Sequence, residues 1–232
     1  MEAVVMAAGD GTRLRPLTER WPKPVLPIDG RPVLATLLRE LAAAELHRVW
    51  LVTGYLAEQV ERLAGDGSGF GVEVRSVRQP APLGSADAVQ RALAAGAVEP
   101  LIVTAADTLF RRGDVARFAD EFTAAKADGA VAVRTDPPPG PGRHAIRRSA
   151  GRVLAMKDED PANPWSGAPL WGIGPEVAKR LGLDRPPYEL EKAFQSAIDY
   201  GRTVIAVEIG KTRDLTYPLD LVEENFPYLQ GT

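Results

Sequence analysis

Residues 3–18 read AVVMAAGDGTRLRPLT, and this stretch decides the fold. Its first five residues, Ala3–Ala7, form a continuous apolar run that ends before Gly9, which is typical of a buried strand. A glycine-rich turn directly after such a strand lets the backbone approach a ligand and aim its N–H groups at it. The opening of the chain therefore predicts a sheet with a ligand-binding loop at the carboxyl end of its first strand.

Strand-like and helix-like stretches alternate from this strand to residue 127. Pro32–Leu46 predicts a helix, because Leu34, Leu37 and Leu41 fall on one face. The alternation favours right-handed crossovers and a mostly parallel sheet with helices on both faces. The other elements predicted here are strands at 49–52, 72–77 and 101–104 and helices at 57–63, 85–93 and 114–127.

The second half of the chain is less regular. A proline-rich stretch at 137–142 predicts a connection without regular structure, and 145–148 with 152–156 predict a small β-hairpin. We expect residues 1–232 to form one α/β, Rossmann-like domain with a mostly parallel mixed sheet. The remaining predicted elements are strands at 130–134 and 204–207 and helices at 175–181, 190–200 and 219–226.

The composition excludes several kinds of chemistry. Lys and Arg total 28 against 31 Asp and Glu, so bulk charge does not favour nucleic acid or an anionic membrane as partner. With no cysteine and only two histidines, His47 and His144, a thiolate nucleophile, a Cys-ligated metal or a Ser-His triad is not expected. Carboxylates, cations and backbone groups are left, and just six of the 28 cations are lysines.

The amino terminus predicts no targeting signal. Met1–Met6 contains an acid and no basic flank, and no apolar run approaches the roughly 18 residues of a membrane span. We therefore expect a cytoplasmic protein.

Three short motifs near the amino end occur in order: Gly9–Leu14, Pro16–Thr18 and Pro22–Pro24. Leu14 occupies the third glycine position of a dinucleotide fingerprint, so that alternative fails. Together the motifs resemble the opening signature of the sugar-1-phosphate nucleotidyltransferases. The resemblance implies that Arg13 contacts the pyrophosphate leaving group and that Lys23 contacts the reacting phosphates. It also implies a loop around the triphosphate that includes Ala8, Gly9, Gly11, Thr12 and Arg13.

Elementary electrostatics agrees with this resemblance. Joining a nucleoside triphosphate to a phosphorylated acceptor brings two polyanions together, so fixed cations and N–H donors must offset their repulsion. Arg13 offers a planar fork for phosphate oxygens, and Lys23 offers a point charge on a backbone fixed by two prolines.

A second motif, at 79–88, follows the third predicted strand and opens a helix. It resembles the segment of the family that binds the base, with Gln79 able to donate and accept as a pyrimidine edge requires. Gly84 would let the base lie close to the backbone. The alternative is a simple helix cap at Ser85. The glutamine favours uracil or thymine, hence UTP or dTTP.

Two aspartates follow predicted strands and resemble the metal ligands of the family. Asp107 lies just after the strand at 101–104, and Asp214 lies after the last strand. Two carboxylates that bridge substrate phosphates through one ion suit Mg²⁺. The alternative for each is a capping role at a turn or a helix.

The segment around Glu159–Gly174 matches the family's acceptor segment only in spacing. The resemblance implies that Glu159 and Gly172 contact the sugar, but Asp160 stands where the family has its phosphate-binding lysine. Lys157 is one candidate for the missing charge. Trp171, like Trp165, has a face on which a sugar or a quaternary ammonium group could stack, or it packs in the core.

The leading hypothesis is a Mg²⁺-dependent enzyme that joins a nucleoside triphosphate to a sugar-1-phosphate and releases pyrophosphate. The first alternative is a cytidylyltransferase acting on a polyol phosphate, phosphocholine or a phosphonate. Two further hypotheses are a glycosyltransferase that binds metal at Asp158–Asp160 and a nucleotide-sugar sensor without activity. We expect no nucleic acid or membrane as partner, and the sequence does not define an oligomeric state.

Overall fold

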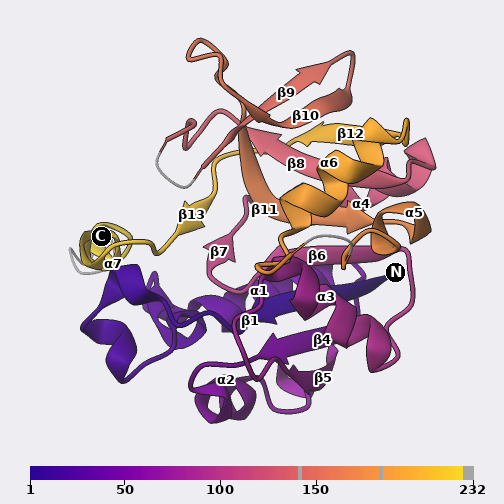
Figure 1. Ribbon diagram of the computed structural model, residues 1–232. Helices are drawn as coiled ribbons and strands as arrows, with labels where there is room; N and C mark the ends of the chain where they lie inside the picture. Colours follow the sequence, from indigo (N-terminus) through magenta and orange to yellow (C-terminus); the bar gives the residue numbers. More distant parts are fainter. Residues whose placement is uncertain (141–142, 183–184, 227–232) are drawn as a thin grey trace.

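The apolar run at the amino end forms the strand that it predicts. A computed structural model describes residues 1–140, 143–182 and 185–226 (Figure 1). In it, β1 (Glu2–Ala7) is a central strand whose residues Ala3, Val4 and Val5 are fully buried. A strand buried on both faces needs helices on both faces, which the alternating pattern supplies.

The first half of the chain contains every predicted element, with ends within three residues of the expected ones. The helices use their leucine or valine stripe to cover the sheet, as in α1, where Leu34, Leu37 and Leu41 are fully buried. The elements are α1 (Val33–Ala43), β4 (Arg48–Thr53), α2 (Ala57–Ala64), β5 (Glu73–Arg78), α3 (Ser85–Ala94), β6 (Leu101–Ala105) and α4 (Asp114–Ala125).

The second half contains the predicted elements and two strands that the pattern did not predict, the two-residue β13 (Arg213–Asp214) and the longer β11 (Ser166–Ile173). The β11 sequence SGAPLWGI holds glycines and a proline that normally argue against a central strand. The others are β8 (Gly129–Arg134), β9 (Ala145–Ser149), β10 (Arg152–Asp158), α5 (Pro175–Ala178), α6 (Leu190–Asp199), β12 (Val204–Glu208) and α7 (Pro218–Glu223). Residues 141–142 of the proline-rich connection lie outside the described residues.

The nine-stranded sheet has the order β5-β4-β1-β6-β11-β8-β12-β10-β9. β1 pairs in parallel with both β4 and β6, so the chain reverses its direction of travel across the sheet beside β1. β11 runs antiparallel to both β6 and β8, which makes the sheet mixed, as predicted. The carboxyl ends of β1, β6 and β8 therefore share one edge, where ligands of such sheets bind.

The far end of the sheet curls. β9 and β10 pair antiparallel at the predicted hairpin. β9 also pairs with the start of β11 through Ala145 and Ser166. The five strands β11, β8, β12, β10 and β9 therefore form a closed ring of pairings. The curl gives this half a concave wall.

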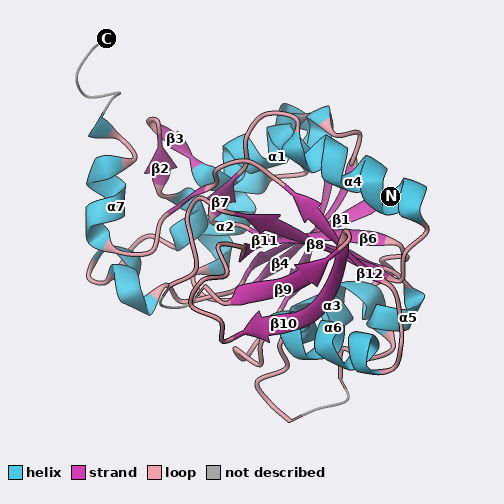
Figure 2. Ribbon diagram, turned by 90° about the horizontal axis from the view of Figure 1, so that it is seen from above, coloured by secondary structure: helices cyan, strands magenta, loops and turns pink. Residues whose placement is uncertain are grey.

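Helices cover both faces of the sheet, as predicted. Figure 2 shows α1 and α4 on one side of the strands and α3, α5 and α6 on the other. Two buried apolar clusters correspond to these faces, one containing Phe118 of α4 and the other Phe194 of α6. None of the described helices is both long and apolar enough to span a membrane.

Two short strand pairs and α7 lie at the carboxyl edge. β2 (Pro27–Ile28) pairs with β3 (Arg31–Pro32), and β7 (Thr108–Leu109) pairs with β13 (Arg213–Asp214). Figure 1 shows α7 beside the indigo amino-terminal segment, although the two are nearly 200 residues apart in sequence.

Candidate active site

The glycine loop after β1 is held by buried side chains from its own motif. Thr18 is fully buried and donates its hydroxyl to the Gly11 carbonyl at 2.9 Å. Gly11 has φ +61, and a Cβ there would lie 2.9 Å from Thr18 Cγ2, so this turn requires glycine. Leu14 is also fully buried and anchors a 3₁₀ turn at Thr12–Leu14. These anchors leave Arg13 exposed at the mouth of the loop.

Lys23 lies between two prolines and begins another 3₁₀ turn, Lys23–Val25. Its Nζ donates to Asp107 Oδ2 in a short contact, and the two side chains are 14% and 26% exposed. The pair joins the loop after β1 to the end of β6.

A two-residue ladder brings the two predicted metal aspartates to the same place. Asp107 immediately precedes β7, and in the pairing of β7 with β13 Asp214 lies opposite Thr108. Thr108 and Thr216 donate hydroxyl hydrogen bonds to Asp107 and Asp214 at 3.2 and 2.9 Å. The backbone pairing thus brings Asp107 and Asp214 into the lining of one cavity.

These carboxylates suit a magnesium ion shared with a substrate. In the described part of the chain, no group of three or more His, Asp or Glu side chains gathers to hold a metal. Mg²⁺ usually takes one or two carboxylates and completes its octahedron with phosphate oxygens and water. A two-carboxylate set beside a phosphate loop fits that pattern.

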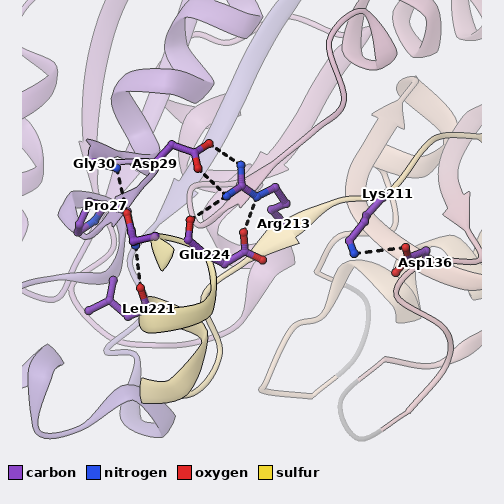
Figure 3. Close-up of polar contacts among 9 residues, drawn as sticks. Pro27, Asp29, Gly30, Asp136, Lys211, Arg213, Leu221 and Glu224 are labelled. Atoms are coloured by element: carbon purple, nitrogen blue, oxygen red, sulfur yellow. Dashed lines mark hydrogen bonds and ion pairs between the residues drawn. The ribbon is translucent and has the colours of Figure 1, made fainter. Parts of the chain in front are cut away.

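Arg213, next to Asp214, connects β13 to neighbouring elements of the site (Figure 3). Its Nη1 and Nη2 donate to the two carboxylate oxygens of Asp29 at 2.5 and 2.9 Å, and its Nε donates to Glu224. The hydrogen bonds to Asp29 raise the pKa of Arg213, and they lower the pKa of Asp29. Arg213 thereby joins the β2–β3 turn, β13 and the residue after α7.

Asn225 reinforces this connection. Its amide nitrogen donates to the Pro27 and Leu221 carbonyls, each at 2.8 Å, and its amide oxygen accepts from the Gly30 N–H at 2.9 Å. Figure 3 shows both networks where the end of the described chain packs on the turn that follows Lys23. Nothing in the sequence pattern marked Asn225, because two of its three partners are backbone atoms nearly 200 residues away.

Two adjoining cavities occupy the carboxyl edge, and both are lined by Arg13, Lys23 and Asp107. The first, about 260 Å³, lies in the glycine loop. The second, about 340 Å³, extends to the curled half of the sheet and includes Asp214 and Trp171. Of the residues predicted for the site, Gly9, Gly11, Thr12, Arg13, Lys23, Asp107, Trp171 and Asp214 line one or both cavities.

Other predicted residues lie outside the two cavities. Lys157 and Glu159 are 63% and 90% exposed and are 4.0 Å apart at the end of β10. A Cβ on Gly172 would meet the Phe122 ring at 2.6 Å, so this glycine is required for packing against α4. The Ala8 carbonyl accepts a hydrogen bond from the Tyr55 N–H at 3.2 Å.

Gln79 and Gly84 also lie outside the lining of these cavities, in a buried network. Gln79 Nε2 donates to the Gly84 carbonyl at 3.0 Å and to Asp87 at 2.7 Å. Gly84 has φ +110, and a Cβ there would lie 2.3 Å from the Tyr188 carbonyl oxygen. The glycine is thus required by the close approach of two backbones, a reason that the motif alone does not reveal.

The second cavity also contains residues that sequence reasoning missed. Arg134, at the end of β8, is 3% exposed, and Glu191 of α6 has its pKa raised by burial. Arg143 and His144 also line this cavity. A signal for Arg134 existed, because it stands at the carboxyl end of a predicted strand, the same position that identified Asp107.

Fold and site together define an α/β protein with a paired-carboxylate site for phosphate-bearing ligands. Comparison with known proteins gives the family. The family described as nucleotidyl transferase matches residues 2–145. The chain is 32% identical to a glucose-1-phosphate thymidylyltransferase from Streptomyces griseus over all of this chain and 67% of that protein. This chain belongs to the nucleotidyl transferase family, and the resemblance to sugar-1-phosphate nucleotidyltransferases is confirmed.

Further matches agree with this assignment. A mannose-1-phosphate guanylyltransferase from Mycobacterium tuberculosis is 30% identical over all of this chain and 65% of that protein, so the chain spans about two thirds of these relatives. The crystal structure of a putative glucose-1-phosphate thymidylyltransferase from Bacillus anthracis superposes with a TM-score of 0.84 at 20% identity, covering 98% and 95% of the two chains. At that identity the superposition establishes the fold alone.

Proposed function

We propose that this protein joins a nucleoside triphosphate, UTP or dTTP, to a sugar-1-phosphate and releases pyrophosphate. The observation that carries the proposal is the meeting of Arg13, Lys23, Asp107 and Asp214 around two adjoining cavities, one for each polyanion. Relatives named for this reaction support it.

The reaction needs positioning more than proton transfer. A phosphate oxygen of the acceptor attacks the α-phosphorus, forming a new P–O bond while the bond from the α-phosphorus to the leaving pyrophosphate breaks in line. The attacking oxygen is already anionic, so the protein supplies no nucleophile or general base. The work of the site is to hold two repelling anions in line and to stabilise the charge that develops.

Each group has a role in this geometry. The N–H groups of the loop around Gly9 and Gly11 bind the triphosphate, Arg13 binds the leaving pyrophosphate, and Lys23 binds the reacting phosphates. Asp107 and Asp214 would hold Mg²⁺, which neutralises charge on phosphate oxygens when bound.

The base and the acceptor follow from the relatives and from the residues. Relatives named as thymidylyltransferases and a uridylyltransferase favour dTTP or UTP, in line with the expectation from Gln79. The hydrogen bonds of Gln79 to Gly84 and Asp87 suit a residue that shapes the base-binding loop. Relatives that act on glucose-1-phosphate favour a sugar over phosphocholine or a phosphonate.

The glycosyltransferase and sensor hypotheses find less support. A glycosyltransferase would bind its metal at Asp158–Asp160, but Asp158 accepts a hydrogen bond from Asn163 at 2.8 Å and the segment lies away from both main cavities. A sensor without activity has no need for the complete set of cations and carboxylates.

A substrate panel tests the proposal. Purified protein would be incubated with Mg²⁺, each of UTP, dTTP, CTP, ATP and GTP, and either glucose 1-phosphate, mannose 1-phosphate, inositol 1-phosphate or phosphocholine. We expect pyrophosphate release that requires a sugar-1-phosphate and is greatest with UTP or dTTP. Release with CTP and a non-sugar phosphate would establish the cytidylyltransferase alternative instead. No release with any pair would refute the proposal.

A further inference from the structure

Arg134 ends a strand that is otherwise apolar. All six residues of β8, Gly129–Arg134, are buried, and Arg134 is 3% exposed. Its backbone carbonyl accepts a hydrogen bond from Ser166 of the neighbouring β11 at 3.4 Å, which fixes the strand end. The side chain lines the second cavity together with Lys23, Asp107 and Asp214.

The guanidinium of Arg134 lacks the partners that a buried cation usually has. Its Nε and Nη1 are buried and have no hydrogen-bond partner, and Arg134 takes part in no ion pair among the described residues. Burial lowers the pKa of Arg134 to about 10, so the group is charged at neutral pH.

The two carboxylates whose charge acts on Arg134 form no ion pair with it and have other partners. Asp214 and Asp136 favour the charged form of Arg134 through their field, but neither is within ion-pair distance. Asp136 pairs with Lys211 at 3.5 Å (Figure 3), and Asp214 accepts from Thr216 at 2.9 Å. The Nε and Nη1 donors of Arg134 are therefore available to a ligand in the cavity.

An unpaired buried charge is costly, and natural structures pair nearly all such groups. A protein keeps one where a ligand brings the missing partner. The cavity indicates an anion: Lys23 and Arg143 add two more cations to a lining whose carboxylates are Asp107, Asp214 and Glu191. Trp171, Ile146 and Met156 supply the apolar surface on which a sugar ring packs.

We propose that Arg134 binds the phosphate of the sugar-1-phosphate acceptor. It would supply the positive charge that the family's lysine supplies at the position of Asp160 here. This assignment rests on the proposed function for the identity of the acceptor. A guanidinium suits the role because its planar N–H groups match two phosphate oxygens at once.

The place of Arg134 in the cavity favours the phosphate over an acidic group on the sugar ring. Arg134 shares its cavity with Lys23, Asp107 and Asp214, which surround the reacting phosphates, and it feels the charge of Asp214. The sugar ring would then contact Trp171 and the apolar side chains of the β9–β10 hairpin, Ile146 and Met156. Arg134 and Lys23 would hold the acceptor phosphate from two sides and orient its attacking oxygen.

The test is direct binding, measured without turnover. Isothermal titration calorimetry of glucose 1-phosphate, with glucose as the uncharged probe, would compare wild type with Arg134→Gln and Arg134→Met. Arg62→Gln is the matched control, because Arg62 is exposed on α2 and far from both cavities. We expect the Arg134 variants to bind glucose 1-phosphate at least about 30-fold more weakly. Mg²⁺–UTP should bind within about twofold of wild type.

Stability separates a ligand-binding role from a structural one. Removing an unpaired buried charge relieves the free protein, so Arg134→Met should raise Tm, by about 2 °C. Unchanged glucose 1-phosphate binding in both variants would overturn the assignment. So would a lowered Tm with acceptor binding retained, or a loss of binding in Lys157→Gln but not in the Arg134 variants.

The outcomes also distinguish this inference from the proposed function. Binding of glucose 1-phosphate that depends on Arg134, without pyrophosphate release for any triphosphate, would refute the reaction and leave Arg134 as the phosphate ligand. Turnover with glucose 1-phosphate that is indifferent to Arg134 would leave the reaction and refute the assignment.

Discussion

The two halves of the site are built in different ways. The half proposed for the nucleotide is built mainly from one continuous stretch, Gly9–Lys23, in which buried Thr18 and Leu14 hold the loop and prolines fix Lys23. The half proposed for the acceptor is assembled from single side chains on β8, β9, β10, β11 and α6, held by sheet pairing and packing. A half whose residues are neighbours in sequence can be recognised as a motif. A half whose residues are brought together by strand pairing cannot.

The largest effect is expected at Asp107, which lines both cavities. Asp107→Asn keeps the size of the side chain but removes the charge that both cavities share. We expect pyrophosphate release to fall at least about 100-fold, because charge stabilisation at the phosphates is lost. The measurement is kcat under saturating substrates, with Asp120→Asn, an exposed site on α4, as the control. Unchanged turnover would mean that Asp107 is not a metal ligand.

The second test asks what a motif glycine is for. Gly84→Ala places a Cβ at φ +110 and 2.3 Å from the Tyr188 carbonyl oxygen, so we expect a loss of about 3 kcal/mol in the free energy of unfolding. Gly113 is the matched control, because its φ is +87 and nothing lies within 4 Å of an added Cβ. Gly113→Ala should cost about 1 kcal/mol in urea denaturation. Equal losses would show that the contact with Tyr188 is dispensable.

The third test loosens the connection that joins the two ends of the chain. Arg213→Ala removes the hydrogen bonds to Asp29 and Glu224, and we expect a loss of about 2 kcal/mol in unfolding free energy. A fall in kcat should accompany it, since Asp214 is the next residue. Arg117 is ion-paired but 45% exposed on α4, so Arg117→Ala should cost under about 1 kcal/mol. The role assigned to Arg213 fails if both variants behave alike.

The smallest effect is expected from pH. Burial raises the pKa of Glu40 on α1 to about 7, and its carboxylate accepts a hydrogen bond from the Phe110 N–H, just after β7, at 3.4 Å. The folded state thus binds a proton that the unfolded state releases near pH 4.5. Stability from this group is present below pH 4.5 and is lost as pH rises through about 7.

The variant Glu40→Gln isolates this contribution. Its unfolding free energy should match wild type near pH 5 and exceed it by about 1–2 kcal/mol near pH 8, after allowance for partial exposure. Urea denaturation at the two pH values is the measurement. Parallel stability curves for the two proteins would contradict the prediction.

Much of the fold could be predicted because its signals are local. Apolar runs and amphipathic stripes, which are visible in each segment by itself, located the main strands and helices from β1 to α4. β11 could not be predicted, because Gly167, Pro169 and Gly172 weaken its strand signal. Tertiary structure explains these residues: the register shifts between Gly167 and Trp171, and Gly172 makes room for Phe122.

The site divides in the same way. Arg13, Lys23 and the two aspartates could be found from motifs and strand ends, and the structure brings them together. Lys157 and Glu159 were chosen by spacing alone, and spacing along the chain does not determine which face of a hairpin meets a cavity. Arg134 stands at the end of a predicted strand but was missed because no motif surrounds it. What marks Arg134 as a candidate ligand-binding residue is a buried guanidinium without a partner, and only the structure reveals that.

The ion pair between Lys23 and Asp107 has a consequence for selectivity. Each group is the counterion of the other, so a bare anion that binds Lys23 leaves Asp107 uncompensated, and a bare cation on Asp107 does the same to Lys23. A phosphate with a bound metal ion would give Lys23 a new anion and Asp107 a new cation in the same binding event. In the proposed reaction the pair would therefore disfavour free phosphate and favour a triphosphate with bound metal, because binding of the cation and of the anion would be coupled through this one ion pair.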